Sequence, residues 1–234
     1  MKIGVIGAMA EEIRALRDAM TDVDVHQVHG MTVFEGKIDQ QEMVLIQSGI
    51  GKVNATISVA ILVERFKVSH VINTGTAGSL DPGLRVGDVV IAHSLAYHDV
   101  DVTAFGHAYG QMSGMPAEYY PNLEMVRLAQ EVARQLNIEP VVGQIVSGDQ
   151  FIQGQKIHDR IMEKFPKARA CEMESTAIAQ ACQVMDVPYA IIRCMSDQAD
   201  GQANVSFDEF VIEAGQKSAV LVQYLIKAMG QSMS

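Results

Sequence analysis

The sequence predicts an α/β protein in which helices cover both faces of a central mixed, largely parallel sheet, giving three layers. Segments of strand length alternate along the chain with segments of helical length, as in folds built on a parallel sheet. The strand segments are continuous apolar runs, which is typical of strands buried on both faces. Because no linker, repeat or low-complexity segment interrupts this pattern, we expect residues 1–234 to form one domain.

The expected strands are short apolar runs bounded by glycine, serine or charged residues. In chain order they are KIGVIG at the start, MVLIQSG (43–49), HVINTG (70–75), GDVVIAHS (87–94), VVGQIVSG (141–148), a short segment near Cys171, and PYAIIRCMS (188–196). In an open α/β sheet, ligands bind outside the carboxyl ends of such strands. The residues that follow each strand are therefore the first candidates for a functional site.

The expected helices lie between these strands and are recognised by their length and by the spacing of apolar residues. They run from about Ala10, over 50–66, over 121–136, over 155–165, over the uncharged run 175–185, and from about Phe207. Pro121 suits the first turn of the helix that it begins. Ser206, with Glu209 three residues later, fits a capping box at the start of the last helix.

Residues 97–120 follow neither pattern and are expected to form a long loop. Aperiodic loops of this length are usually functional or disordered, and the aromatic and methionine content of this segment argues against disorder. We therefore expect either substrate or a second subunit to cover it.

Composition and charge exclude several classes of function. The formal net charge is −10 and the pI is near 5.1, so the surface would repel nucleic acid and anionic membranes. Apolar runs are too short to span a bilayer, and Glu11 and Glu12 interrupt the N-terminal run too early for a secretory signal. The three cysteines have no CxxC spacing and are expected to be reduced core residues. These observations predict a cytoplasmic protein.

Four carboxylates come after expected strands. Glu12 follows the first strand, Glu172 and Glu174 follow the segment near Cys171, and Asp197 follows the last strand. Charge is kept out of buried segments unless it is paired or used. Each residue alone is explained at least as well by a favourable charge or cap at a helix start. Together they favour a site, because all four are expected at the same edge of the sheet.

Three other patterns give weaker indications. GIGKVN (49–54) is neither the G-x-G-x-x-G fingerprint of dinucleotide-binding folds nor a P-loop. TGTAGS (74–79) is interpreted as a turn that lets a ligand approach the backbone closely, although a tight strand–helix turn explains it too. The histidines and aspartates of HDVDVTAFGH (98–107) could bind a metal, but their spacing matches no zinc pattern, and we expect no metal site.

Short motifs recur in order along the whole chain: IGAMAEE, SGIGKVNA, NTGTAG, GDVV, DVTAFG, SGDQFI, CEMES, MSDQAD and SFDEF. Together they resemble the bacterial 5'-methylthioadenosine/S-adenosylhomocysteine nucleosidases. EMES followed by SD is typical of the wider nucleoside phosphorylase–hydrolase superfamily, and the first and sixth motifs narrow the resemblance to these nucleosidases. The resemblance implies a nucleoside phosphorylase-like fold, a homodimer, and a reaction without cofactor or metal.

The implied reaction hydrolyses the N-glycosidic bond of 5'-methylthioadenosine and S-adenosylhomocysteine, and also of 5'-deoxyadenosine, releasing adenine and the thioribose. By match of motif, Glu12 activates water and Asp197 is the acid at adenine N7. The remaining implied substrate-binding residues are Glu174 and the Met173 backbone for the ribose hydroxyls, Phe151 and the Ile152 backbone for adenine, Met9, Ile50, Val102, Phe105 and Phe207 for the apolar 5' pocket, and Thr76, Gly78, Glu172, Arg193 and Ser196 around them. Glu172 is expected to act mainly as a structural support.

Elementary chemistry agrees with this assignment of roles. An N-glycosidic bond breaks through an oxocarbenium-like state, which needs a proton donor at the leaving base and a carboxylate that directs water. Each such group typically contributes about 10²–10⁴-fold to the rate. Burial at the end of an apolar strand favours the protonated form of a carboxyl group, and Asp197 has that setting.

Three alternatives stay open at this point. A nucleoside phosphorylase of the same fold would need basic residues for phosphate, and the segments 7–12, 48–54 and 74–79 contain only Lys52. A dinucleotide-dependent oxidoreductase would need the missing glycine fingerprint. A non-catalytic binder of adenosine analogues would not require Glu12 and Asp197 together. Thr76 stands where the family most often has serine and His107 where tyrosine is common, which affects the expected shape of the 5' pocket.

Overall fold

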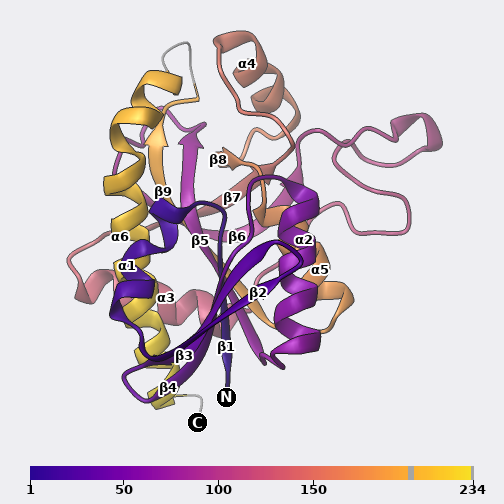
Figure 1. The fold of residues 1–234 in the computed structure, drawn as a ribbon. Helices are drawn as coiled ribbons and strands as arrows, with labels where there is room; N and C mark the ends of the chain where they lie inside the picture. Colours follow the sequence, from indigo (N-terminus) through magenta and orange to yellow (C-terminus); the bar gives the residue numbers. More distant parts are fainter. Residues whose placement is uncertain (200–202, 233–234) are drawn as a thin grey trace.

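The computed structural model describes residues 1–199 and 203–232, and within this range the side chains of 203–206, 208 and 209 are not described. Figure 1 shows a central sheet with helices on both of its faces, so the predicted α/β class with a mixed, largely parallel sheet is confirmed. The strands are β1 (Ile3–Gly7), β2 (Thr21–Val28), β3 (Met31–Ile38), β4 (Gln41–Gln47), β5 (His70–Ser79), β6 (Val89–Tyr97), β7 (Val141–Ser147), β8 (Ala168–Glu172) and β9 (Tyr189–Asp197).

Most of the described α-helices pack on the two faces of the sheet, whereas the helix Gln155–Lys164 packs in a smaller third cluster (Figure 1). The π-helical segment Ile61–Arg65 directly follows the helix Lys52–Ala60, and the 3-10 segment Thr103–Phe105 lies in the loop after β6. The α-helices are α1 (Ala10–Ala19), α2 (Lys52–Ala60), α3 (Leu123–Gln135), α4 (Gln155–Lys164), α5 (Ser175–Val184) and α6 (Ala203–Ser232).

The sheet order is β2-β3-β4-β1-β5-β8-β7-β6-β9, and β9 also pairs with β5. The strands β5, β8, β7, β6 and β9 therefore close into a ring, from which β1, β4, β3 and β2 extend as an open arm. Pairing is parallel for β1 with β4 and β5, for β5 with β9, and for β7 with β6 and β8. This arrangement brings the carboxyl ends of β1, β5, β8 and β9 together.

Alternate residues of the buried strands belong to the two larger of the three hydrophobic clusters in the described range. In β4, Met43 and Leu45 belong to the cluster that contains residues of α1, α3 and α6, whereas Val44 and Ile46 belong to the cluster that contains residues of α2 and α5. All four side chains are fully buried. This two-sided burial explains why the strand is a continuous apolar run, since a strand with one solvated face would alternate apolar and polar residues.

The sequence did not predict the hairpin of β2 and β3. Most of β2 is exposed and its sequence, TDVDVHQV, carries little apolar signal. The two strands are joined through His29 and Gly30, which both have positive φ angles, and they pair antiparallel. An exposed edge strand buries too little apolar surface to be recognised from composition.

Two further expectations need correction. Residues 74–79 do not form a turn, because β5 continues to Ser79 and pairs with β9 and then with β8. The last helix begins at Ala203 rather than near Phe207. Ser206 therefore lies inside the helix, and the predicted capping contacts of Ser206 and Glu209 fall on side chains outside those that the structure describes. Across the described range, no helix has the length and apolarity needed to traverse a membrane.

Candidate active site

A cavity of about 350 Å³ opens where the carboxyl ends of β1, β5, β8 and β9 meet. Thirteen of the sixteen residues expected from the sequence line it, namely Met9, Glu12, Ile50, Thr76, Gly78, Phe151, Ile152, Glu172, Met173, Glu174, Ser196, Asp197 and Phe207. The volume suits a small organic ligand rather than a polymer. Four further lining residues were missed, Ala8, Ala77, Gln150 and Cys171, each adjacent in sequence to an expected one.

Glu12 lies at the third position of α1 with its carboxylate buried at the cavity wall. Its Oε2 accepts hydrogen bonds from the backbone N–H groups of Ala8 (2.8 Å) and Met9 (3.1 Å). Its Oε1 accepts from the backbone N–H of Thr76 (2.9 Å) and from the Thr76 hydroxyl (3.2 Å). Glu12 is thus a helix cap and a cavity residue at once, and four donors hold its carboxylate in one orientation.

Asp197 ends β9 and is 2% exposed. Its Oδ2 accepts a hydrogen bond from the Ser196 hydroxyl (2.9 Å), and its Oδ1 accepts one from the backbone N–H of Ala199 (2.8 Å). The carboxylate lies close to the backbone of Gly78, because a Cβ at that position would come within 2.7 Å of Asp197 Oδ1. Gly78 is therefore required by the close approach of β5 to this carboxylate.

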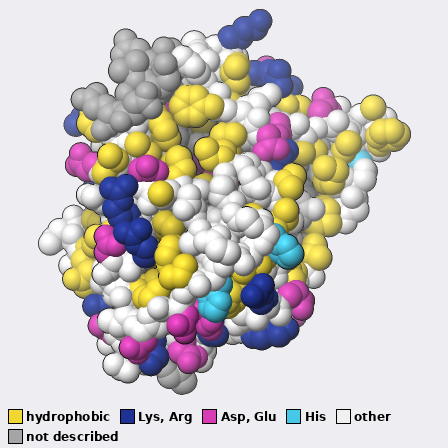
Figure 2. Space-filling view, viewed as in Figure 1, with side chains coloured by type: hydrophobic (Ala, Val, Ile, Leu, Met, Phe, Trp, Pro, Cys, Tyr) yellow, Lys and Arg dark blue, Asp and Glu magenta, His cyan; other side chains and the backbone are white. Residues whose placement is uncertain are grey.

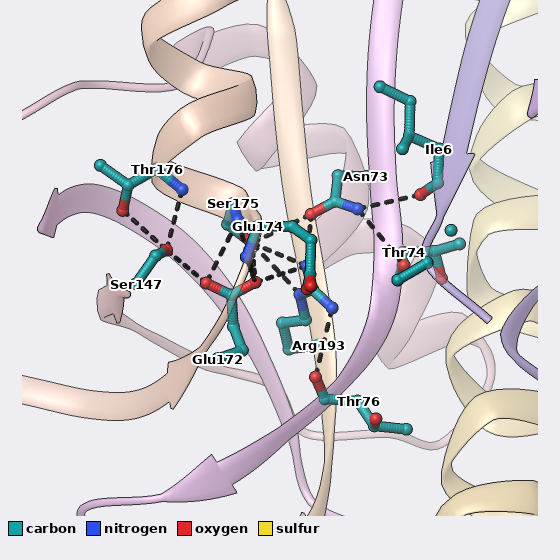
Figure 3. A network of polar contacts seen from close by, with 12 residues as sticks. Ile6, Asn73, Thr74, Thr76, Ser147, Glu172, Glu174, Ser175, Thr176 and Arg193 are labelled. Carbon is teal, nitrogen blue, oxygen red and sulfur yellow. Dashed lines mark hydrogen bonds and ion pairs between the residues drawn. The ribbon is translucent and has the colours of Figure 1, made fainter. Parts of the chain in front are cut away.

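Arg193 is fully buried behind the cavity wall and joins the carboxylates to the sheet (Figure 3). Its Nη2 lies 2.6 Å from Glu172 Oε2 and 3.6 Å from Glu174 Oε2, and it donates to Asn73 Oδ1 at 2.6 Å. Its Nη1 donates to the Thr76 carbonyl at 3.2 Å. A buried guanidinium needs such partners, since an unpaired one would be strongly unfavourable.

Glu172 directs its hydrogen bonds into the protein rather than into the cavity. It accepts from the Ser147 hydroxyl, from the backbone N–H of Glu174 (3.0 Å), and from the N–H (2.9 Å) and hydroxyl (2.9 Å) of Ser175. Together with the Arg193 ion pair, these contacts occupy both of its oxygens. This geometry favours the structural role that the sequence suggested for Glu172.

Glu174 precedes α5 and is buried, with fewer partners than Glu172. Its Oε1 accepts a hydrogen bond from the backbone N–H of Gly51 at 2.9 Å. Burial first, and then repulsion from Glu172, raise the pKa of Glu174, while Arg193 and the Gly51 N–H oppose the rise. A carboxylate that is buried with incomplete pairing at a cavity is a candidate for binding polar ligand groups.

The other side of the cavity is apolar. Phe151 follows β7 and contacts Phe207 of α6 edge to face, with ring centroids 5.7 Å apart. Phe151 is 44% exposed in the single chain, so a flat ligand could stack on it. Met9, Ile50 and Ile152 are further apolar residues of the cavity lining. The cavity thus combines an aromatic surface for a planar group with carboxylates for hydroxyl or N–H groups.

Val102 and Phe105 do not line this cavity in the single chain. They lie in the loop after β6 that projects from the body in Figure 1, and Phe105, in the 3-10 segment, is 80% exposed. Figure 2 shows hydrophobic side chains on the same projection. His107, which stands where tyrosine is common in the family, belongs to this loop as well. The hydroxyl of Thr76, the other departure from the family pattern, donates its hydrogen bond to Glu12.

The two aspartates considered as metal ligands have partners of their own. Asp99 pairs with Lys52, and Asp101 accepts hydrogen bonds from the N–H and hydroxyl of Thr103. His98 is buried, and burial lowers its pKa. Among the described residues, no cluster of three or more potential ligands could hold a metal ion.

Comparison with known proteins relates the whole chain to one superfamily of enzymes. The model of the phosphorylase superfamily matches residues 2–228. A 5'-methylthioadenosine/S-adenosylhomocysteine nucleosidase of Staphylococcus haemolyticus is 45% identical over 227 residues, which are 97% of this chain and 100% of the relative.

Solved structures agree with the sequence comparison. The S-adenosylhomocysteine nucleosidase of Streptococcus pyogenes, in complex with 5-methylthiotubericidin, has a TM-score of 0.95 and 44% identity, covering 98% of this chain and 97% of that chain. The 5'-methylthioadenosine/S-adenosylhomocysteine nucleosidase of Neisseria meningitidis, in complex with methylthio-immucillin-A, has a TM-score of 0.95 and 43% identity, covering 97% and 99%.

Proposed function

The chain belongs to the phosphorylase superfamily and, within it, to the 5'-methylthioadenosine/S-adenosylhomocysteine nucleosidases, and from this premise we propose how its residues perform the reaction. The enzyme hydrolyses the N-glycosidic bond of 5'-methylthioadenosine and of S-adenosylhomocysteine, releasing adenine and the thioribose. The observation that carries the proposed mechanism is that Glu12 and Asp197, buried carboxyl groups from opposite ends of the sequence, line one cavity.

Asp197 is the proposed acid. As the glycosidic bond breaks, negative charge develops on adenine, and a proton shared with N7 stabilises the leaving group. The Ser196 hydroxyl and the Ala199 N–H fix both carboxyl oxygens, so the group is oriented before substrate arrives. Orientation in advance lowers the reorganisation needed in the transition state.

Glu12 is the proposed base that directs water to the sugar carbon. Its four hydrogen bonds stabilise the carboxylate and fix its direction. Glu174 and the Met173 backbone would hold the ribose hydroxyls, while Phe151 stacks on adenine and the Ile152 backbone binds its edge. Arg193 and Glu172 would support Glu174 from behind. The mechanism uses water and calls on no metal or cofactor.

The contacts of the nearby cations support water rather than phosphate as the nucleophile. Lys52, the one basic residue in the segments that border the site, lies 2.6 Å from Asp99. Arg193 is enclosed by Glu172 and Glu174. A phosphate dianion needs free donors of positive charge, and these two cations are already neutralised by carboxylates.

We expect 5'-deoxyadenosine to be a further substrate, because it keeps the adenine and ribose groups that the proposed contacts recognise. We also propose that residues 1–234 act as one nucleosidase domain. The active form is a proposed homodimer in which the 97–120 loop lies at the interface and at the rim of the active site. The exposure of Phe105, at 80%, supports this arrangement.

Adenine release tests the proposed mechanism. The enzyme should release adenine from 5'-methylthioadenosine at the same rate with and without inorganic phosphate, and EDTA should not slow it. The sugar product should be free thioribose. Strict dependence on phosphate, with a sugar 1-phosphate as the product, would instead support a phosphorylase mechanism.

A further inference from the structure

Three segments, two of which contribute residues to the cavity, are joined to one another outside it by Lys52, Asp99 and Asp149, which we call the Lys52 triad. Lys52 begins α2 directly after Gly51, Asp99 follows β6, and Asp149 follows β7. From the sequence, Lys52 was considered only as a phosphate ligand and Asp99 only as a metal ligand. None of the three lines the cavity itself.

The triad is a closed ring of polar contacts. The Lys52 ammonium lies 2.6 Å from Asp99 Oδ2 and 3.8 Å from Asp149 Oδ2. The backbone N–H of Lys52 donates to Asp149 Oδ1 at 2.8 Å, and the backbone N–H of Asp149 donates to Asp99 Oδ2 at 2.9 Å. Each residue therefore contacts both of the others, and two of the contacts involve backbone, which fixes the segments and not only the side chains.

Asp99 is the most buried residue of the Lys52 triad. Its side chain is 13% exposed, against 24% for Lys52 and 50% for Asp149. Asp99 Oδ2 receives both the Lys52 ammonium and the Asp149 N–H, while its buried Oδ1 has no hydrogen-bond partner among the described residues. Loss of Lys52 would leave a mostly buried carboxylate without a counter-ion, which is more costly than loss of a surface ion pair.

The packing beside the ring leaves little freedom. A Cβ added to Gly148 would lie 2.5 Å from His98 Cε1 and 2.8 Å from Asp99 Cγ. The backbone before Asp149 is thus pressed against the segment that carries Asp99. These two segments can approach this closely only because residue 148 has no side chain.

Each joined segment leads to a different part of the proposed substrate site. The N–H of Gly51, next to Lys52, donates to Glu174 on the ribose side. Asp149 lies two residues before Phe151 on the adenine side, and Asp99 lies three residues before Val102 on the 5' side. A relative shift of these segments would change the distance between the adenine and ribose contacts without altering either set of contacts internally.

We propose that Lys52 and Asp99 are positioning residues that hold the adenine-binding and ribose-binding segments at the separation that an intact nucleoside requires. This inference rests on the proposed function. It predicts a specific signature: without the Lys52 triad, a ligand that spans both segments binds more weakly, whereas adenine alone, which contacts one of them, does not.

The test compares Lys52→Met with a matched control, Lys2→Met. Lys2 pairs with Glu35 and is 25% exposed at its side chain, close to the 24% of Lys52, but it lies before β1 at the opposite end of the sheet. We expect Lys52→Met to weaken binding of methylthio-immucillin-A by about tenfold and adenine by less than about twofold, measured by calorimetry. The KM for 5'-methylthioadenosine should rise more than kcat falls. Lys2→Met should change none of these values.

Two further variants separate positioning from simple loss of stability. Lys52→Arg keeps the charge and should recover most of the binding of methylthio-immucillin-A. Asp99→Asn should reproduce the effect of Lys52→Met, and the double variant should lose less than the product of the two single effects, because the residues form one contact. If Lys52→Met does not fold, the same binding measurements on Asp99→Asn test the proposal.

Equal weakening of adenine and methylthio-immucillin-A, or indistinguishable behaviour of Lys52→Met and Lys2→Met, would overturn the inference. Failure of the proposed function would look different. In that case the wild-type enzyme itself would release no adenine from 5'-methylthioadenosine, whatever the state of the Lys52 triad.

Discussion

The two sides of the proposed substrate site are constructed differently. The carboxylate side is formed where strands end, and Glu12, Glu172, Glu174 and Asp197 are all buried within one chain, which also supplies their hydrogen-bond partners. The proposed 5' side also uses the 97–120 loop, where Phe105 is largely exposed. Buried charges need fixed hydrogen-bond donors, which the sheet supplies, whereas an apolar wall needs only cover, which a second molecule can supply. In the proposed homodimer, the single chain supplies the chemistry and the 5' residues Met9, Ile50 and Phe207, and the loop completes the 5' pocket.

The largest effect on kcat is expected from substitutions on the carboxylate side. Asp197→Asn cannot release a proton to adenine, and Glu12→Gln cannot accept one from water, although both keep their shape. Each variant should lower kcat by at least about 10²-fold. Binding of methylthio-immucillin-A, followed by calorimetry, should change much less than kcat. Turnover within a few-fold of wild type in both variants would mean that these residues are only helix and turn caps.

Glu174→Ala should behave differently from those two variants. Ribose contacts act in the ground state as well as in the transition state, so both KM and kcat should worsen, each by about tenfold. Because Glu12, Glu174 and Asp197 act on one substrate, double variants should lose less than the product of the single effects. A change in kcat alone would remove Glu174 from the ribose contacts. Steady-state kinetics of adenine release decides between these outcomes.

A smaller effect is expected on the loop side. Phe105→Ala should raise the KM for 5'-methylthioadenosine several-fold with little change in kcat, since the residue would only cover the 5' group. Val25→Ala is a suitable control, because Val25 is 61% exposed on β2 and does not line the cavity. Sedimentation should show a dimer at micromolar concentration. A fully active monomer would contradict the proposed role of the loop.

The smallest expected effect concerns stability. Because the pKa of Glu174 is raised in the folded protein, the folded state keeps this proton to higher pH than the unfolded chain does. The free energy of unfolding should therefore fall as pH rises from the ordinary carboxyl range toward the raised pKa. Glu174→Gln cannot ionise, so its Tm relative to wild type should increase between about pH 5 and about pH 9. A difference in Tm that is independent of pH would show that Glu174 does not carry this penalty.

The same contrast explains what could be predicted from the sequence. The strand-end residues were predictable, because continuous apolar runs locate the strands and the next polar residue locates the sheet edge. The partners of those residues were not predictable, since Arg193 reaches Asn73 across 120 positions and no local pattern encodes such a pair. The exposed strand β2 was missed for lack of apolar signal, and the turn predicted within β5 was wrong because glycines there serve close approach rather than chain reversal.

The closure of β5, β8, β7, β6 and β9 into a ring has a consequence for aggregation. Within the described part of the chain, β2 is the one strand of the sheet left with an unpaired edge. That edge carries Asp22 and Asp24 beside an irregular register at its start. Charge and a break in register both hinder the addition of a foreign strand. Copies of this chain should therefore not associate by extending the sheet, even at high concentration. Association would instead use exposed apolar surfaces such as that of the 97–120 loop.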